Sequence, residues 1–392
     1  MFKTKSLLQG AVTACVMGLA ALSHAADLGV LIGTHNSGAD KGFRLAHFDT
    51  QTGKLTTPAL IMHSDGCAYF IITPDGKFLY TCNSVTNFGG VQHMGALSAF
   101  ALDTKNGTLK LLNQVPSGGE DPSYISLDKT GKYALVANYQ GNRVPGEGGT
   151  VAVFALKEDG SFGQRTAFDQ HKGTSIDPSR QKQAYAHSII TDPSNRFALC
   201  PDLGLDKVFI YKFDEKTGHL IPNDPAFAAV KPGSGPRHVI FHPNGKIVYV
   251  VHEMGSMITA FHWDAEKGAL SPFQEVSTLP ADFKGTSVCA EMRILPDGKW
   301  IYASNRGHDS IAQFSVDPQN FKLTLVGTVP SGGQTPRNFD FDPEFKWMLV
   351  TNHGDNKAAV FKLDQTTGKL TQSGMSVPVD YPFCPRFFLP SP

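Results

Sequence analysis

The chain has 392 residues, of which 41% are hydrophobic and 18% are charged, and it contains 39 glycines and 25 prolines. Lys and Arg together equal Asp and Glu at 35 each, so the overall charge gives no sign of nucleic acid or an acidic membrane surface as a partner. The length would allow two domains, but closed all-β folds often run this long as one unit.

The first residues have the pattern of an export signal. Lys3 and Lys5 precede an apolar run over residues 7–22, and Ser23-His24-Ala25 supplies a small-x-small cleavage pattern. The run is short for a transmembrane span. We therefore predict that residues 1–25 are a signal peptide and that the mature protein is released into a bacterial periplasm, with no membrane attachment after cleavage.

The six cysteines bear on export and on redox state. Cys15 ends a sequence that resembles a lipobox, so a lipoprotein is an alternative to simple export. The five other cysteines are an odd number without zinc-binding spacing, which excludes a disulfide framework. Cys67 and Cys82 lie symmetrically about a turn, so a cross-strand disulfide is one interpretation. Two small buried apolar residues are the other.

Two sequence units recur along the chain with a period of about fifty residues. The first is a Pro-Asp-Gly-Lys-like turn between apolar strands, at residues 74–77, 129–132, 193–196, 243–246, 296–299 and 343–346. The second is a polar turn that ends on an apolar residue: Leu55, Leu109, Phe162, Leu220, Leu270, Leu323 or Leu370. Each period then holds four short antiparallel strands, which is typical of a propeller blade. We predict an all-β, seven-bladed β-propeller.

The unequal counts of the two units predict how the ring closes. Six turns of the first kind and seven of the second imply one blade divided between the termini. Residues 384–390 resemble the inner strand at residues 335–341, which aligns Arg386 with Arg337, and Leu28–Thr34 can supply the missing partner strand. This pairing would leave no open edge. We expect a single domain over residues 26–392, with surface loops at residues 142–149 and 171–183.

The register of the repeat predicts which side chains converge on the channel, because inner strands line the centre of a propeller. The starts of the inner strands carry Ala68, Ser123, His187, Arg237, Ala290, Arg337 and Arg386, followed by Tyr69, Tyr124, Ser188, His238, Glu291, Asn338 and Phe387. The adjacent strand ends carry Asn83, Asn138, Asp202, His252, Asn305 and Asn352, then Ser84, Tyr139, Leu203, Glu253, Arg306 and His353.

Arg, His and Glu side chains at one mouth of the channel indicate an acid–base site that can stabilise an anion. Structural roles are the alternative: His187 as a core hydrogen-bonding residue, the Pro-Arg pairs as ties between blades, and the asparagines in turns. Glu253 is harder to explain that way, because a buried carboxylate is costly unless it is paired. Motifs for serine hydrolases, zinc peptidases, phosphate loops and CxxC sites are absent from the sequence. We expect neither a metal nor a cofactor.

Five segments carry a resemblance to a known family: residues 186–188, 235–243, 290–293, 302–307 and 334–337. They resemble the lactonase-type seven-bladed propellers, typified by the propeller class of bacterial 6-phosphogluconolactonase and by fungal cis,cis-muconate lactonising enzymes. The resemblance implies a metal-independent site made of one His, two Arg and one Glu. These correspond to His187, Arg237, Arg306 and Glu253, with a second acidic position at Glu291.

The resemblance and the export signal together predict a periplasmic lactonase that hydrolyses a sugar lactone such as glucono-1,5-lactone. His187 or Glu253 would be the general base, and Arg237 and Arg306 would stabilise the oxyanion. We expect substrate contacts from His238, Glu291, Asn305, Arg337 and Asn138. One alternative is 6-phosphogluconolactonase activity, with a further Arg or Lys on the phosphate, although such enzymes act in the cytoplasm. Another is a non-catalytic propeller that binds a carbohydrate or a protein. The sequence does not predict the oligomeric state.

Overall fold

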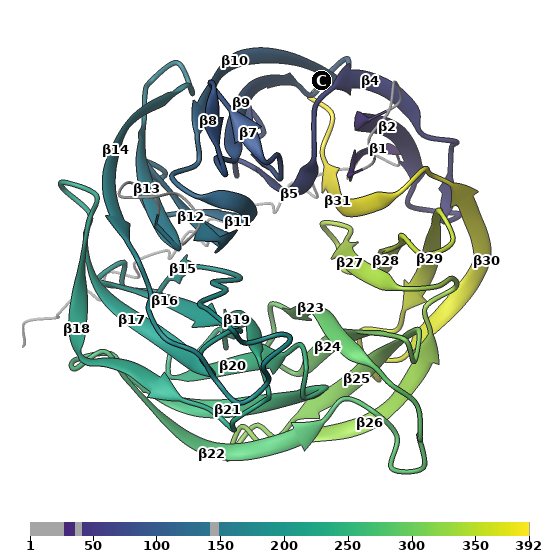
Figure 1. Cartoon of the computed structure of the whole chain (residues 1–392). Coiled ribbons are helices and arrows are strands. Elements are labelled where there is room, and N and C mark those ends of the chain that lie inside the picture. Colours follow the sequence, from purple (N-terminus) through teal and green to yellow (C-terminus); the bar gives the residue numbers. More distant parts are fainter. Residues whose placement is uncertain (1–26, 36–40, 142–148, 392) are drawn as a thin grey trace, which may run out of the picture.

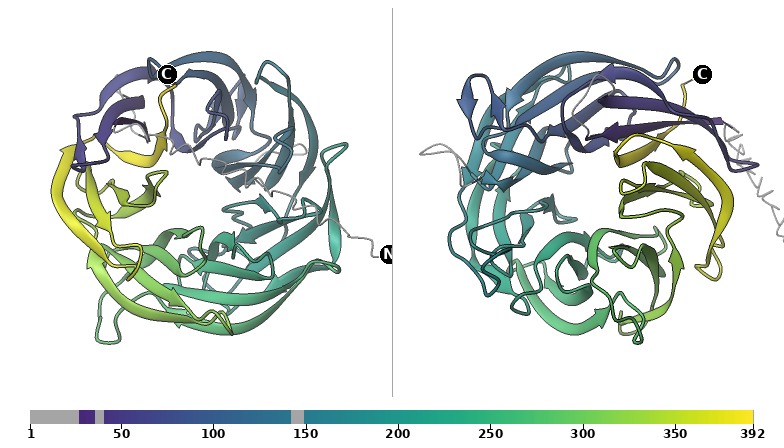
Figure 2. Two further views of the ribbon diagram at one scale, coloured as in Figure 1. Left: turned by 180° about the vertical axis from the view of Figure 1, so that it is seen from behind. Right: turned by 45° about the vertical axis from the view of Figure 1, so that its right-hand side comes forward.

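The computed structural model describes residues 27–35, 41–141 and 149–391. These residues form seven sheets around a central channel, together with one short separate hairpin (Figures 1 and 2). The predicted all-β, seven-bladed propeller with four antiparallel strands per blade is confirmed. The predicted signal peptide, the lipobox at Cys15 and most of the predicted loop at residues 142–149 lie outside the described residues. Among the described residues, no helix is long and apolar enough to cross a membrane.

Each blade places its strands from the channel outward. The first blade contains β31 (Pro382–Phe388), β1 (Asp27–Thr34), β2 (Gly42–Asp49), β3 (Lys54–Leu55) and β4 (Ala59–His63). The second contains β5 (Cys67–Ile72), β6 (Phe78–Asn83), β9 (Ala96–Asp103) and β10 (Thr108–Pro116), with the hairpin β7 (Asn87–Phe88) and β8 (Val91–Gln92) beside it. The third contains β11 (Glu120–Leu127), β12 (Tyr133–Gln140), β13 (Val151–Leu156) and β14 (Phe162–Asp169).

The remaining four blades repeat the same order. The fourth contains β15 (Ile190–Thr191), β16 (Phe197–Asp202), β17 (Lys207–Asp214) and β18 (His219–Ala229). The fifth contains β19 (Pro236–Phe241), β20 (Ile247–His252), β21 (Met257–Asp264) and β22 (Ala269–Ser277). The sixth contains β23 (Val288–Ile294), β24 (Trp300–Arg306), β25 (Ser310–Val316) and β26 (Leu323–Pro330). The seventh contains β27 (Pro336–Phe341), β28 (Trp347–Asn352), β29 (Lys357–Leu363) and β30 (Leu370–Pro378).

The hydrophobic core lies between neighbouring blades. Every residue of β20 and of β28 is buried, because both faces of these second strands are covered by adjacent sheets. This explains why such strands appear in the sequence as continuous apolar runs rather than as alternating patterns. The turns before the second strands contain a residue in the left-handed region, which is Gly245 before β20 and Gly298 before β24, with φ of 69° and 74°.

Ring closure occurs as predicted, by antiparallel pairing of β31 with β1, in which Gly29 lies opposite Phe388. The two strands lie side by side in Figure 1, yellow beside purple. The alignment of Arg386 with Arg337, however, is wrong. Pro382 pairs with Thr34 and Cys384 with Gly33, so Phe383 takes the position of Arg337. The backbone hydrogen-bond register aligns Pro382-Phe383 with Pro336-Arg337, and the Pro385-Arg386 pair lies three residues further along β31.

A β-bulge at the start of the inner strands prepares the channel mouth. In β19, Pro236 pairs with His252 and His238 with Val251, which leaves Arg237 without a directly opposite residue. The same shift isolates Ala68, Ser123, Arg337 and Phe383 on their strands. Because a bulge bends the strand and redirects a side chain, the repeat places one such residue from several blades near the mouth.

The cysteines in the described residues are free and buried. Cys67 lies opposite Asn83, whereas Cys82 lies opposite Tyr69, so the strand register does not place the two cysteines as a facing pair. The cross-strand disulfide is therefore wrong, and the interpretation as buried apolar residues holds. Burial raises the pKa of the Cys67 thiol to about 12, which makes it a poor thiolate nucleophile.

The contact between Gly29 and Phe388 predicts how sensitive ring closure is to packing. A side chain at Gly29 would overlap the buried ring of Phe388. We expect Gly29→Val to lower the free energy of unfolding by about 1–3 kcal/mol through overpacking, measured by chemical denaturation. Gly327→Val is the matched control, because no atom lies near a Cβ at that strand position. Equal stabilities of the two variants would contradict the role assigned to this contact.

Candidate active site

A cavity of about 300 Å³ opens at the mouth of the channel where the inner strands begin. Three of the four predicted catalytic residues, His187, Glu253 and Arg306, line it together with Arg337. They come from different blades: Glu253 directly follows β20, and Arg306 ends β24. The register of the repeat, rather than closeness in sequence, thus assembles the site.

Glu253 is the centre of the charge arrangement. Its Oε2 atom lies 3.0 Å from Nε of Arg237 and 2.9 Å from Nη2 of Arg306, while Oε1 lies 2.5 Å from Nη2 of Arg180. Burial alone raises the pKa of this carboxyl, but the guanidinium charges, that of Arg306 foremost, outweigh it and hold the pKa well below the usual range. Glu253 is therefore ionised and a weak proton acceptor while these contacts last.

His187 is a neutral imidazole beside this carboxylate. Its Nε2 lies 3.8 Å from Oε2 of Glu253, and Tyr139 packs edge-on against the ring at 5.4 Å. Burial, followed by the charge of Arg237, lowers the pKa of His187 well below 6.5. Its buried Nδ1 has no hydrogen-bond partner among the described residues. The imidazole is therefore unprotonated at neutral pH, which is the form that can accept a proton.

Two guanidinium groups face the cavity with unused hydrogen-bonding capacity. Arg306 donates from Nη2 to the carbonyl of Cys289 at 2.8 Å, but its buried Nε has no partner in the described chain. Arg337 stacks on the ring of Phe383 at 4.1 Å without a hydrogen bond or ion pair within the same residues, although the carboxylates of Asp121 and Glu253 line the same cavity. Burial, followed by the charges of Arg237 and Arg306, lowers the pKa of Arg337 to about 9. Such groups favour an anion in the cavity.

Arg237, the fourth predicted catalytic residue, lies behind Glu253 and is not among the residues that line the cavity. It is 3% exposed, and its Nη1 donates to the carbonyl of Ala290 at 2.5 Å. Its Nε is directed to Glu253. The structure therefore places Arg237 as a support for the carboxylate rather than as a group that faces the cavity.

The predicted substrate contacts Asn138 and Asn305 are fully buried and turned away from the cavity. The amide of Asn138 donates to the carbonyls of Ser117 and Gly149 at 3.2 and 3.1 Å, and that of Asn305 to the carbonyl of Thr278 at 3.0 Å. Asn at these strand ends satisfies loop carbonyls, which is the structural alternative that the sequence left open.

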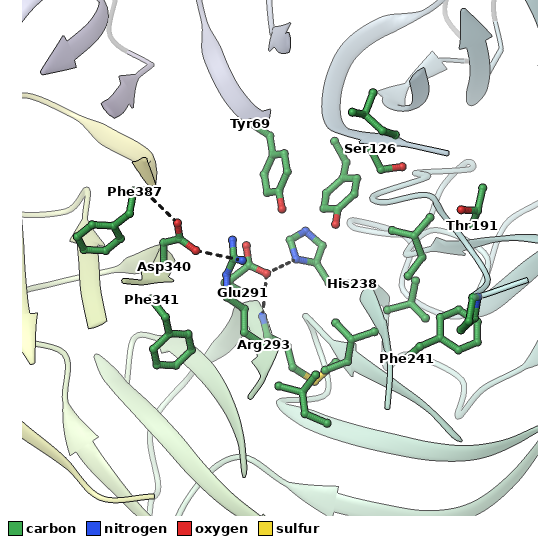
Figure 3. Close-up of a pocket in the computed structure, with 18 of the residues that line it drawn as sticks. Tyr69, Ser126, Thr191, His238, Phe241, Glu291, Arg293, Asp340, Phe341 and Phe387 are labelled. Carbon is green, nitrogen blue, oxygen red and sulfur yellow. Dashed lines mark hydrogen bonds and ion pairs between the residues drawn. The ribbon is translucent and has the colours of Figure 1, made fainter. Parts of the chain in front are cut away.

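His238 and Glu291 are placed one layer deeper. They line a second cavity of about 590 Å³ at the opposite mouth, where the inner strands end. Figure 3 shows both side chains among the residues that line it. The side chain of Asn338 lies beside them, and Tyr69 points toward them from β5. The structure therefore does not bring these two predicted substrate contacts into the cavity that holds His187 and Arg306.

Arg180 is a site residue that the sequence did not reveal. It belongs to the loop at residues 171–183, which departs from the repeat and was expected to be only a surface loop. His171 anchors the loop through Nδ1, 2.7 Å from Oδ2 of Asp202, and Gln181 donates to the carbonyl of Leu203 at 2.8 Å. The loop thus folds against the mouth. The one signal in the sequence was indirect: a buried carboxylate at Glu253 needs cationic partners, and these can include a residue outside the repeat.

No group of three or more His, Cys, Asp or Glu side chains in the described parts of the chain could hold a metal ion. The chemistry that this arrangement supports is acid–base catalysis with cationic stabilisation of a negative charge.

Comparison with known proteins identifies the family. Residues 29–387 match the family described as a lactonase with a seven-bladed β-propeller. The chain belongs to this lactonase family. The 6-phosphogluconolactonase of Bacillus subtilis is 31% identical over 80% of the chain and 84% of its own length. The 6-phosphogluconolactonase of Formosa agariphila is 32% identical over 77% of the chain and 82% of its own length. The Pseudomonas aeruginosa periplasmic gluconolactonase superposes with a TM-score of 0.86 at 30% identity, covering 93% of this chain and all of that one.

Membership of the family makes the protein a lactone hydrolase, the class of enzyme that the sequence predicted. The family and fold are shared with proteins described for two different lactones, one phosphorylated and one not. The substrate of this lactonase must therefore be argued from its own site.

The charge cluster predicts a stability effect at Glu253. We expect Glu253→Gln to lower the free energy of unfolding by about 3 kcal/mol at pH 7, because buried guanidinium groups lose their counter-charge. The depressed pKa makes this contribution full above the ordinary glutamate pKa of about 4.3 and lost as the pH falls through the lower folded value. Denaturant unfolding of both proteins across this pH range should show the difference narrowing.

Glu266→Gln is the control, since that carboxylate is 86% exposed and pairs with Arg196 at the surface. Its loss should change stability by at most about 0.5 kcal/mol. A pH-independent effect at Glu253 would contradict the assignment.

Proposed function

We propose that this lactonase is exported to the periplasm and hydrolyses glucono-1,5-lactone to gluconate. The observation that carries the proposal is the neutral imidazole of His187 beside ionised Glu253 in a cavity lined by Arg306 and Arg337. The signal pattern over residues 1–25 supports export, and the similarity to a periplasmic gluconolactonase supports both location and substrate. Sugar phosphates are not expected in that compartment.

In the proposed mechanism, His187 accepts a proton from the water that attacks the lactone carbonyl. Between the two candidates for the base, the contacts favour His187, because three guanidinium groups hold the charge of Glu253. Glu253 then stabilises the imidazolium that forms 3.8 Å away. Arg306 and Arg337 stabilise the oxyanion of the tetrahedral intermediate and later the product carboxylate.

The same imidazolium returns its proton to the departing ring oxygen, so that the acyl carbon–oxygen bond breaks and gluconic acid forms. Its carboxyl group carries the second proton of the water and loses it to solvent, which leaves gluconate. The proton removed from water in the first step is thus used in the second, and no other reactant is needed. In place of the oxyanion role expected for Arg237, the geometry favours Arg337, which lines the cavity.

Activity measurements test this mechanism. Purified protein should release acid from glucono-1,5-lactone faster than the spontaneous reaction, followed by pH-stat titration. We expect His187→Ala to lower kcat by about 10²–10⁴-fold, the usual size of general acid–base assistance. His262→Ala, at an exposed histidine on β21, should retain full activity. No rate above the spontaneous reaction, or an unaffected rate in His187→Ala, would overturn the proposal.

A specific observation favours a second candidate, hydrolysis of 6-phosphogluconolactone. Arg337 faces the cavity without a direct ion pair among the described residues, although Glu253 and Asp121 line the same cavity, and an additional anionic group on the substrate would supply such a pair. Arg337 would then be the further arginine or lysine that this alternative expects on the phosphate. A neutral lactone gives Arg337 only the developing oxyanion.

Substitution of Arg337 separates the two substrates. If the lactone is unphosphorylated, Arg337→Gln should lower kcat on glucono-1,5-lactone by about 10²-fold, as removal of an oxyanion donor does. If the phosphate binds there, KM for the phosphorylated lactone should rise much more than kcat falls, and wild-type protein should prefer that substrate. Steady-state kinetics on both lactones decide. Lys212→Gln, far from the cavity on β17, is the control for loss of a positive charge.

A further inference from the structure

We propose that His238 and Glu291 are positioning residues that hold Glu253 in place through Arg237. The inference rests on the proposed hydrolysis reaction, in which Glu253 is the carboxylate beside the base. It changes the role expected for these two residues from contact with substrate to support of the site from behind. A continuous set of contacts leads from the catalytic cavity to the opposite mouth of the channel.

The first part of this chain fixes Arg237. Its Nε donates to Oε2 of Glu253 at 3.0 Å, and its Nη1 donates to the carbonyl of Ala290 at 2.5 Å. The same Nη1 lies 2.9 Å from Nε2 and 3.4 Å from Nδ1 of His238. An atom close to both ring nitrogens lies against the imidazole face, so His238 is the surface on which the guanidinium rests.

The second part fixes His238. Oε1 of Glu291 lies 3.2 Å from Nδ1 of His238 and accepts the backbone N–H of Met292 at 3.0 Å. Oε2 of Glu291 accepts from the amide of Asn338. Figure 3 shows Glu291 directed at the imidazole from the neighbouring blade. An ionised carboxylate can only accept, so Nδ1 carries the proton and the tautomer and orientation of the ring are set.

The surroundings keep His238 neutral and immobile. The rings of Tyr124 and Tyr69 pack against it at 5.1 and 6.2 Å, and His187 packs from the side of the catalytic cavity at 5.4 Å. Burial, followed by the charge of Arg237, lowers the pKa of His238 to about 4. The pKa of Glu291 falls to about 2, because His238 and nearby arginines outweigh the effect of burial. A neutral ring accepts the guanidinium against its face, whereas a protonated ring would repel it.

Position argues against substrate contact as the main role. His238 and Glu291 are each 3% exposed and line the cavity at the far mouth rather than the one with His187 and Arg306. Outer groups that orient a reacting group commonly change activity by about 10–100-fold when removed. The contacts from Glu291 through His238 and Arg237 to Glu253 are of this kind, because each residue orients the next.

A double-mutant cycle tests the inference. Glu291→Gln should lower kcat on glucono-1,5-lactone by about 10–100-fold while KM stays within about twofold, because ground-state substrate contacts are unchanged. In an Arg237→Gln background the same substitution should have almost no further effect, since the link it acts through is gone. Asp340→Asn is the matched control. Asp340 lines the same far cavity but pairs with Arg293, which is not one of the residues that link Glu291 to Glu253, so its loss should leave kcat unchanged.

His238→Phe is the second variant if Glu291→Gln does not fold, because it keeps a flat ring but loses the N–H that donates to Glu291. It too should have almost no further effect on kcat in the Arg237→Gln background. The inference would be overturned if the fold-losses in kcat of the two single variants multiplied in the double variant. It would also be overturned if Glu291→Gln raised KM and left kcat unchanged. If wild-type protein hydrolyses no lactone, the proposed function fails. The positioning claim is then decided by a crystal structure of the Glu291→Gln variant. Loss of the contact between Arg237 and Glu253 would support the inference, and an unchanged contact would overturn it.

Discussion

The pairing of β31 with β1 is the interaction on which the rest of the structure depends. The first blade combines strands from both ends of the chain, so the ring is closed only by the non-covalent pairing of β31 with β1. Once the pair forms, the second strand of a blade has a neighbouring sheet on both faces, which allows continuous apolar strands such as β20 and β28. The channel, and hence the relative placement of residues from different blades, follows from closure.

Within the closed ring, one buried negative charge organises the site. Glu253 would be costly in the interior without partners, and guanidinium groups from the fifth and sixth blades and from the loop at residues 171–183 surround it. Arg337 stacks on Phe383 and has no direct ion pair among the described residues, so positive charge is in excess around Glu253. The same excess that keeps Glu253 ionised therefore favours an anion in the cavity, as the proposed mechanism requires.

The channel can be viewed as two layers with different tasks. The outer layer holds His187, Arg306 and Arg337 near strand ends, and at Arg337 a bulge redirects the side chain toward the cavity. The inner layer holds His238 and Glu291, which are almost fully buried and hydrogen-bonded to each other. Such a division explains why two adjacent positions of one repeat, Arg237 and His238, both carry functional residue types although neither lines the catalytic cavity.

The sequence by itself determined the seven blades, the closure at the termini and the meeting of His187, Glu253 and Arg306, because a repeat of fixed period fixes the register of every blade. It did not determine the direction of side chains at that register. Asn138 and Asn305 turn to loop carbonyls, Phe383 replaces Arg386, and His238 and Glu291 face the other mouth, all through bulges and hydrogen bonds that leave no periodic signal. Arg180 reaches Glu253 from a loop outside the repeat, so only tertiary packing could place it.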